Sequence, residues 1–142
     1  SILVASRDEG LLPDCLRGMG ARVEEDGGEL TVFLPEATAA VTLANLAANG
    51  RIAVCFSRPS DHRSLQVKGR VVAVEEADEA DRAAVQRYRQ LLAAELSPVG
   101  VPPRLSLRMA HEPCRAVRLR VESLFVQTPG PGAGAPLGGS RS

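Results

Sequence analysis

Apolar and polar residues alternate along residues 64–74, and this alternation predicts a β-strand with two different faces. Leu65 and Val67 fall on one face, which suits a hydrophobic core, because successive side chains of a strand point to opposite sides of the sheet. The other face carries Ser64, Gln66, Lys68 and Arg70. Neighbouring side chains on that face stand about 7 Å apart, so the row suits either solvent or a polar ligand.

Five other segments have the character of strands: residues 2–6, 16–24, 29–34, 51–57 and 116–126. Residues 26–28, Asp-Gly-Gly, predict a hairpin turn between the second and third of them. Residues 51–57 are apolar on both faces, which predicts a central strand. Gly18, Gly20 and Gly69 lie inside predicted strands, where glycine indicates a bulge or a bend.

In two other segments the apolar residues recur at helical spacing instead of alternating. Pro35 and Gly50 flank residues 36–49, whose alanines and leucines recur at helical spacing, and both stand where helix punctuation is expected. Residues 78–96 form a second amphipathic helix that starts at an N-cap, Asp78. Its predicted apolar face consists of Val85, Tyr88, Leu92 and Leu96. The sequence therefore predicts a mainly β (α+β) fold, a six-stranded antiparallel β-barrel with two flanking helices.

The predicted barrel domain covers residues 1–127, and a Gly- and Pro-rich tail covers residues 128–142. A chain of 142 residues is long enough for one domain with a hydrophobic core. The tail has too few apolar residues to bury much surface, so on its own it is expected to be disordered.

Composition excludes several classes of partner. Seventeen basic and seventeen acidic residues give no net charge, so neither nucleic acid nor a membrane surface is an expected partner. No apolar run reaches about 18 residues, and the first residues do not have the pattern of a secretory signal. A cytoplasmic protein is the resulting expectation.

Cysteine and histidine are too sparse to predict a metal site or a catalytic triad. Cys15, Cys55 and Cys114 are isolated from one another, without a CxxC pair, so neither a disulfide framework nor a zinc site is expected. His62 precedes the polar strand, where it either contacts a ligand or faces solvent. His111 is either a haem ligand or a residue of a surface loop.

Residues 45–54, 56–69 and 125–131, together with the order of the elements, resemble the pyridoxamine 5′-phosphate oxidase-like family of FMN-binding split barrels. The resemblance implies a homodimer that holds FMN in grooves between the subunits, on the outer face of the barrel. It also implies a set of cofactor-binding residues, which we predict to be Arg17, Thr42, Arg63, Ser64, Gln66 and Lys68.

Two motifs of that family support this set. The oxidase has an Arg-Gln-Val-Arg stretch that touches the flavin, and residues 63–66 stand at those places, with Lys68 two residues further on. Arg17 stands near the place of an early arginine that faces the cofactor in the family. Gln66 replaces the second arginine of the motif, which argues against pyridoxamine phosphate oxidation itself.

A third motif departs from the family. The oxidase has Ser-Arg-Lys at the start of its first helix, where the two cations hold the flavin phosphate, whereas this chain has Ala40, Val41 and Thr42. We expect Thr38, Thr42, the helix N-terminus and an arginine from elsewhere to hold the phosphate instead. The loss of one charged partner, about 1.5–3 kcal/mol, predicts a roughly tenfold to hundredfold weaker FMN affinity.

The resulting hypothesis is an FMN-binding protein that carries out redox chemistry on an unknown small substrate. Two alternatives stay open at this point. One is a module without catalysis that binds flavin or haem, and the other is a deazaflavin-dependent reductase.

Overall fold

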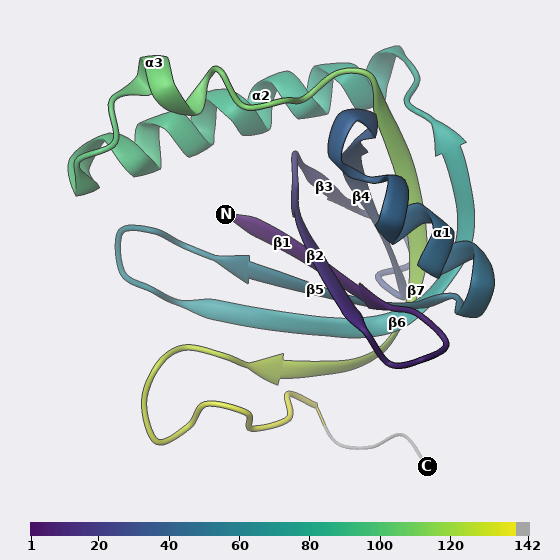
Figure 1. Ribbon diagram of the computed structural model, residues 1–142. Coiled ribbons are helices and arrows are strands. Elements are labelled where there is room, and N and C mark those ends of the chain that lie inside the picture. The colour runs from purple at the N-terminus through teal and green to yellow at the C-terminus, as the bar shows by residue number, and fades with distance from the viewer. Residues whose placement is uncertain (139–142) are drawn as a thin grey trace.

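The computed structural model describes residues 1–138 and shows a curled, mainly antiparallel sheet with helices at one end and along one side (Figure 1). Its strands are β1 (Ile2–Arg7), β2 (Pro13–Gly18), β3 (Ala21–Val23), β4 (Glu29–Pro35), β5 (Arg51–Ser57), β6 (Ser64–Glu76) and β7 (Cys114–Val126). They are ordered β2-β1-β5-β6-β7-β4-β3 in the sheet, so β5 is an interior strand with a neighbour on each side. The helices are α1 (Ala40–Asn49), α2 (Glu79–Leu96) and α3 (Pro103–Ser106), with 3₁₀ turns at Glu36–Thr38 and Ser97–Val99.

The prediction of six strands was wrong, because the segment predicted as one strand over residues 16–24 is divided between β2 and β3. Gly20 has φ +141°, a conformation that few other residues adopt. Met19 N donates to Phe33 O at 2.8 Å, and Phe33 N donates to Gly20 O at 3.0 Å. The chain therefore leaves β1 and joins β4 within three residues, and this turn links the two ends of the sheet into a half-barrel.

Gly69 is the bend that the sequence predicted in β6. The pairing of β6 with β7 shifts between Lys68 and Gly69. A Cβ atom at residue 69 would stand 2.1 Å from the carbonyl oxygen of Arg120, so no larger residue fits without moving β7. This close contact allows the two longest strands to curl around the core.

The core lies on the concave, inner face of the sheet. Its fully buried members come from four strands, β1, β4, β5 and β7, and include Val4, Val32, Leu34, Val54, Val117 and Leu119. α1 packs against β1, β2 and β5 and inserts Leu46 into this core. Two further bonds attach it, from Asn45 Nδ2 to Ser6 Oγ (3.0 Å) and from Asn49 Nδ2 to the carbonyl of Arg7 (2.8 Å).

α2 begins at Asp78, as predicted, with a reciprocal capping box. Asp81 N donates to Asp78 Oδ1 at 2.8 Å, and Asp78 N donates to Asp81 Oδ2 at 3.1 Å. These two bonds satisfy backbone groups that the first helical turn would otherwise leave unpaired. None of the helices within residues 1–138 is both long and apolar enough to cross a bilayer.

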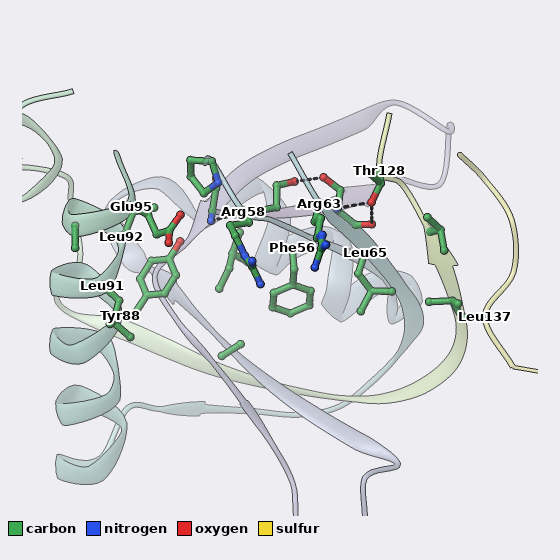
Figure 2. A pocket seen from close by; sticks show the side chains of 18 residues that line it. Phe56, Arg58, Arg63, Leu65, Tyr88, Leu91, Leu92, Glu95, Thr128 and Leu137 are labelled. Carbon is green, nitrogen blue, oxygen red and sulfur yellow. Dashed lines mark hydrogen bonds between the residues drawn. The ribbon is translucent and has the colours of Figure 1, made fainter. Parts of the chain in front are cut away.

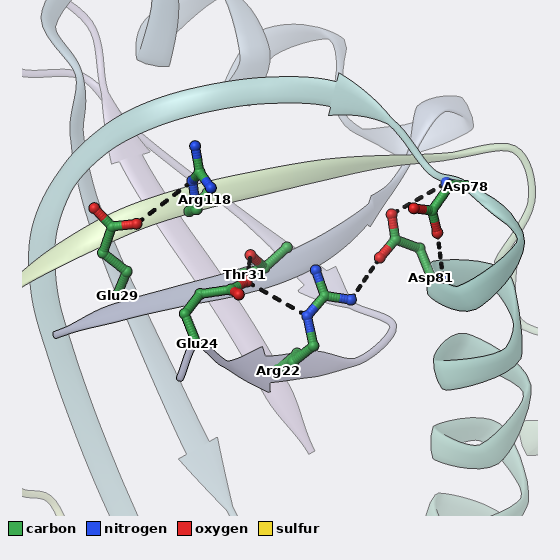
Figure 3. Close-up of polar contacts among 7 residues, drawn as sticks. All are labelled: Arg22, Glu24, Glu29, Thr31, Asp78, Asp81 and Arg118. Atoms are coloured by element: carbon green, nitrogen blue, oxygen red, sulfur yellow. Dashed lines mark hydrogen bonds and ion pairs between the residues drawn. The ribbon is translucent and has the colours of Figure 1, made fainter. Parts of the chain in front are cut away.

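The same aspartate attaches α2 to the edge strand β3 (Figure 3). Arg22 Nη1 lies 2.7 Å from Asp81 Oδ1, and this hydrogen bond raises the pKa of the guanidinium above its ordinary value. Thr31 donates to Glu24 Oε1 at 2.5 Å, and with Arg22 nearby it lowers the pKa of the Glu24 carboxyl. The start of α2 is thus fixed by charge at β3, whereas its C-terminal half approaches the opposite end of the sheet.

The segment predicted as a disordered tail is attached to the sheet over its described part, residues 128–138. It turns back beside β7, where Val126 N donates to Ala135 O at 2.9 Å and Gly134 N donates to Val126 O at 2.7 Å. Backbone pairing with β7, which needs no apolar side chains, holds the segment there, whereas the expectation of disorder concerned the tail on its own. Residues 139–142 lie outside the described part.

Candidate functional site

Four of the six predicted cofactor residues share the outer face of the sheet: Arg17, Ser64, Gln66 and Lys68. Strand pairing aligns one row across β2, β1, β5, β6 and β7, which consists of Arg17, Leu3, Cys55, Gln66 and Phe125. Lys68 lies in the adjacent row, between Ala53 and Ser123. Both rows lie on the outer face, and so do Ser57 and Ser64 at the end of the two strands. We use the name outer row for all of these residues together.

The outer row changes from cationic to apolar to polar along its length. Arg17 stands at one end, exposed, with its Nη1 3.1 Å from Ser1 Oγ. Leu3 and Cys55 follow, and three steps between strands put Gln66 about 14 Å from Arg17. At this other end Gln66 Oε1 accepts a hydrogen bond from Gln127 Nε2 at 3.3 Å.

Lys68 is the only lysine in the chain and lies over an aromatic ring. Its Nζ is 5.2 Å from the centroid of Phe125, which is the geometry of a cation–π contact. Lys68 is exposed, and within residues 1–138 it forms no ion pair. An ammonium group, an amide and a ring therefore stand together at the β6–β7 end of the outer row.

The turn between β5 and β6 is held by hydroxyl groups. Ser64 N donates to Thr128 Oγ1 at 3.0 Å, and Ser64 Oγ lies 2.9 Å from Ser57 Oγ. Arg63, another predicted cofactor residue, is exposed in this turn with its Nε 3.5 Å from Asp61 Oδ2. His62 is exposed beside it with φ +61°, so neither side chain belongs to the outer row.

Thr42, the sixth predicted residue, lies apart from the others. It is fully buried in α1, and its Oγ1 donates to Asp14 Oδ2 at 2.5 Å. Asp14 lies on the same face of β2 as the buried Leu16, on the inner side of the sheet. A phosphate would reach this hydroxyl only if the bond to Asp14 opened, and Thr42 as a cofactor contact stays a prediction.

A cavity of about 930 Å³ lies on the opposite, inner side of the β5–β6 end, between the sheet and α2 (Figure 2). We call it the inner cavity. Its walls are mainly apolar, with Ile2, Phe56, Leu65 and Val126 from the sheet and Tyr88, Leu91 and Leu92 from α2. Burial raises the pKa of the Tyr88 phenol above its ordinary value. The charged residues of the lining are Arg58, Arg63 and Glu95.

The sequence profile of the pyridoxamine 5′-phosphate oxidase family matches residues 3–124. The chain belongs to this family. The membership confirms the resemblance recognised in the sequence, and the curled half-barrel agrees with it. No curated protein matches the sequence at a significant level.

Several solved structures share the fold. Group A Streptococcus HupZ superposes with a TM-score of 0.55 at 17% identity, covering 94% of this chain and 89% of that one. An F420 reductase gives 0.54 at 17% identity, with coverages of 87% and 86%. An FMN-binding protein from Syntrophomonas wolfei subsp. wolfei gives 0.53 at 12% identity, with coverages of 89% and 76%. At these identities the likeness is one of fold.

Sequence reasoning missed four residues that this oxidase-family fold brings to the two regions: Leu3, Cys55, Arg58 and Glu95. The first two lie in segments that were predicted as strands, but residues 51–57 are apolar on both faces, so the sequence did not show that Cys55 points outward. Their position beside Gln66 was not, because it depends on the register between β1, β5 and β6. Arg58 and Glu95 line the same cavity only because α2 crosses over the sheet, and no local pattern signals that.

The remaining histidine and cysteine side chains do not form a metal centre. No three His, Cys, Asp or Glu side chains in residues 1–138 are close enough to hold a metal ion. His111 lies in the loop before β7, with Nδ1 3.0 Å from the carbonyl oxygen of Met109. Cys114 is buried nearby, and burial raises the pKa of its thiol to about 11.

Proposed function

We propose that this member of the pyridoxamine 5′-phosphate oxidase family binds FMN, or a closely related flavin nucleotide, on the outer row. We further propose that it catalyses two-electron redox chemistry on a small substrate. The observation that carries the proposal is the convergence of Arg17, Gln66 and Lys68 on one face of the sheet. A structure with the same fold is described as an FMN-binding protein, which supports the choice of cofactor.

The chemistry of the outer row fits a flavin nucleotide. The amide of Gln66 and the ammonium group of Lys68 can bond to the polar edge of the ring system, and Phe125 adds an aromatic surface beside them. Leu3 and Cys55 form an apolar floor for the body of the ring. A bound flavin supplies two-electron transfer, and the chain's part is to orient the ring and to stabilise charge at its edge.

The first helix offers few binding groups for the phosphate of the cofactor. Residues 40–42 carry no cation, and Thr42 is already bonded to Asp14. Arg17 is the better partner, because it lies on the outer face, at the end of the row remote from Gln66. A single guanidinium in place of two cations agrees with the weaker affinity expected from the sequence.

We also propose a homodimer in which the second copy covers the outer row. Leu3 is 43% exposed in the middle of this face, where a bound flavin would otherwise stay open to water on its far side. Leu3→Glu should therefore abolish both the dimer and flavin retention in sedimentation and absorbance measurements. Leu12→Glu is the control, because Leu12 is 69% exposed and lies outside this row.

The first experiment is an absorbance spectrum of the purified protein before and after addition of FMN and desalting. Flavin bands that survive desalting are expected, and a protein that stays colourless would overturn the proposal. Flavin affinity, followed by fluorescence quenching, should fall at least tenfold in the Gln66→Ala/Lys68→Ala double variant. Arg70→Ala is the matched control, since Arg70 is also an exposed cation of β6 but pairs with Glu122 beyond the bulge.

Two further measurements separate the alternatives. Bleaching of the bound flavin by NADH or NADPH indicates an oxidoreductase, whereas tight binding without reduction by any donor indicates a carrier. The F420 reductase among the structures with this fold makes a deazaflavin the second candidate cofactor. Competition between F420 and FMN for the apoprotein decides between them, and a Soret band in the first spectrum would instead indicate haem.

A further inference from the structure

We propose that the inner cavity is a second ligand site, which binds an organic anion with an extended apolar body independently of the flavin. The cavity goes beyond the proposed redox function, because it lies on the opposite face of the sheet from the outer row. Leu65 and Phe56 line it, whereas their neighbours Gln66 and Cys55 point outward. Alternation along β5 and β6 therefore puts these side chains on opposite faces, and of the outer-row residues only Ser57 and Ser64, beside the turn, also border the cavity.

The size and lining of the cavity fit a small apolar ligand. Its volume of about 930 Å³ lies near the upper end of the range for small-molecule sites. Leu91 on α2 and Leu137 on the returning tail stand at its two sides and are 61% and 45% exposed. Large apolar side chains exposed beside a cavity lined by Phe56 and Leu92 form one continuous surface that a ligand would shield from water.

The positive charges at the cavity favour an anionic ligand. Arg58 Nη1 lies 3.2 Å from Asp61 Oδ2, and Arg63 Nε lies 3.5 Å from the same oxygen. Two guanidinium groups thus share one carboxylate, and the turn keeps an excess positive charge. Their side chains are 55% and 74% exposed, so both can rotate to meet a carboxylate or phosphate without breaking buried contacts.

Glu95 determines which end of the cavity the anionic head of the ligand avoids. Figure 2 shows its carboxylate beside Tyr88, on the α2 side of the cavity, with Arg58 and Arg63 toward the middle and the tail side. Its Oε2 is buried and has no hydrogen-bond partner within the described residues. An anionic head is repelled from this end and attracted to the arginines, which leaves the apolar body against Phe56 and Leu65.

The test is calorimetric titration of the full 142-residue chain with decanoate and, as a charge control, with decyltrimethylammonium. Decanoate should bind at least tenfold more tightly than the cation of equal chain length. Arg58→Gln should weaken decanoate binding at least fivefold, whereas Arg51→Gln should not change it, because Arg51 is an exposed arginine at the other end of β5. Equal binding of the two amphiphiles, or an unchanged Arg58→Gln variant, would overturn the proposal.

A second pair of variants tests the apolar wall. Leu91→Ser should lower decanoate affinity, and Leu105→Ser should leave it unchanged, because Leu105 is a similarly exposed leucine of α3 that does not line the cavity. If Leu91→Ser dissociates a dimer that binds no decanoate, a second copy fills the cavity and the proposal fails. If FMN displaces decanoate and Arg58→Gln loses both ligands, the cavity is the flavin site and the proposal fails. Loss of flavin binding alone contradicts only the proposed redox function.

Discussion

The outer row and the inner cavity use alternate residues of the same two strands, and they differ in almost every physical property. Of the outward side chains, the half-buried Gln66 is hydrogen-bonded to Gln127 and the exposed Lys68 lies over Phe125. Inward side chains such as Phe56 and Leu65 face a helix that arrives from a distant part of the chain. Because the side-chain period of a strand is two, a slip of one residue would exchange the two faces completely.

Both faces therefore depend on the register of β6, which Gly69 helps to fix. Gly69→Ala places a methyl group 2.1 Å from the Arg120 carbonyl oxygen, and relief requires a backbone shift in β7. We expect a loss of about 3 kcal/mol or more in the free energy of unfolding, measured by urea denaturation. This is the largest expected effect, and it should weaken ligand binding at both faces together.

Gly132→Ala is the control for that variant, because a Cβ atom at residue 132 meets no atom within 4 Å. Its stability should stay within about 0.5 kcal/mol of the parent. If Gly69→Ala is equally mild, the close approach of β6 and β7 is not what sets the register.

Asp81 offers a way to disturb the inner cavity alone. Asp81→Ala removes the acceptor for Arg22 and half of the capping box, so the start of α2 loses its attachment to β3. We expect a loss of about 2 kcal/mol in the free energy of unfolding. Binding of decanoate should weaken with it, because α2 carries one wall of the cavity, while flavin binding on the outer row should change little.

The matched control is Glu79→Ala, which removes a negative charge from the same helical turn without removing a side-chain contact of the described structure. A similar loss in the free energy of unfolding in both variants would mean that the negative charge near the helix N-terminus stabilises the protein and that the contact with β3 does not.

These variants also show which features the sequence could predict. The Asp78 cap, the outward direction of Gln66 and Lys68, and the bend at Gly69 are local, because each depends on a few neighbouring residues. The pattern of strands and glycines predicted the barrel class, and the short motifs of the family resemblance agreed with it. The set of site residues predicted from the sequence was nevertheless incomplete, since the row from Arg17 to Gln66 is created by pairing between four strands.

What the sequence did not show has a common physical cause. The break between β2 and β3 was read as a bulge, because two glycines permit either a bulge or a change of partner strand. The hydrogen bonds from Met19 N to Phe33 O and from Phe33 N to Gly20 O decide between them. Thr42 was predicted as a cofactor contact from its position in a motif, and this stays a prediction, but its hydrogen bond to Asp14 could not be read from the sequence. Long-range contacts decide both the strand division and this bond.

Tyr88 reports on the inner cavity through its ionisation. It is the only tyrosine in a chain without tryptophan, so its phenolate absorbance can be followed without interference. Burial raises its pKa above the ordinary value of about 10, because the charged phenolate is disfavoured there. The titration midpoint should therefore lie above pH 10 in the folded protein.

The sign of the linked stability follows from the same shift. The folded state favours the protonated phenol, so the contribution of Tyr88 to stability is complete below about pH 10 and is lost as the pH rises through the raised pKa. Decanoate should move the midpoint further upward, and FMN should not. A midpoint at or below pH 10 would contradict the burial of Tyr88.

The smallest expected effect concerns the rates at which the three cysteines react with a thiol reagent. Cys15 is exposed and Cys55 is half-buried, both on the outer face, whereas Cys114 is buried. With a pKa of about 11, Cys114 has roughly one thiolate in a thousand at about pH 8, so it should react last. Mass spectrometry of the peptides resolves the three rates.

The ligands should then change these rates selectively. Cys55 lies between Leu3 and Gln66 in the outer row, so bound FMN should slow its modification severalfold, while decanoate should leave it unchanged. The Cys15→Ser variant removes the exposed thiol and leaves Cys55 and Cys114 to be compared within one sample. Protection of Cys55 by decanoate but not by FMN would mean that the two ligands occupy the opposite faces from those assigned, because a small molecule shields only the side of the sheet on which it lies.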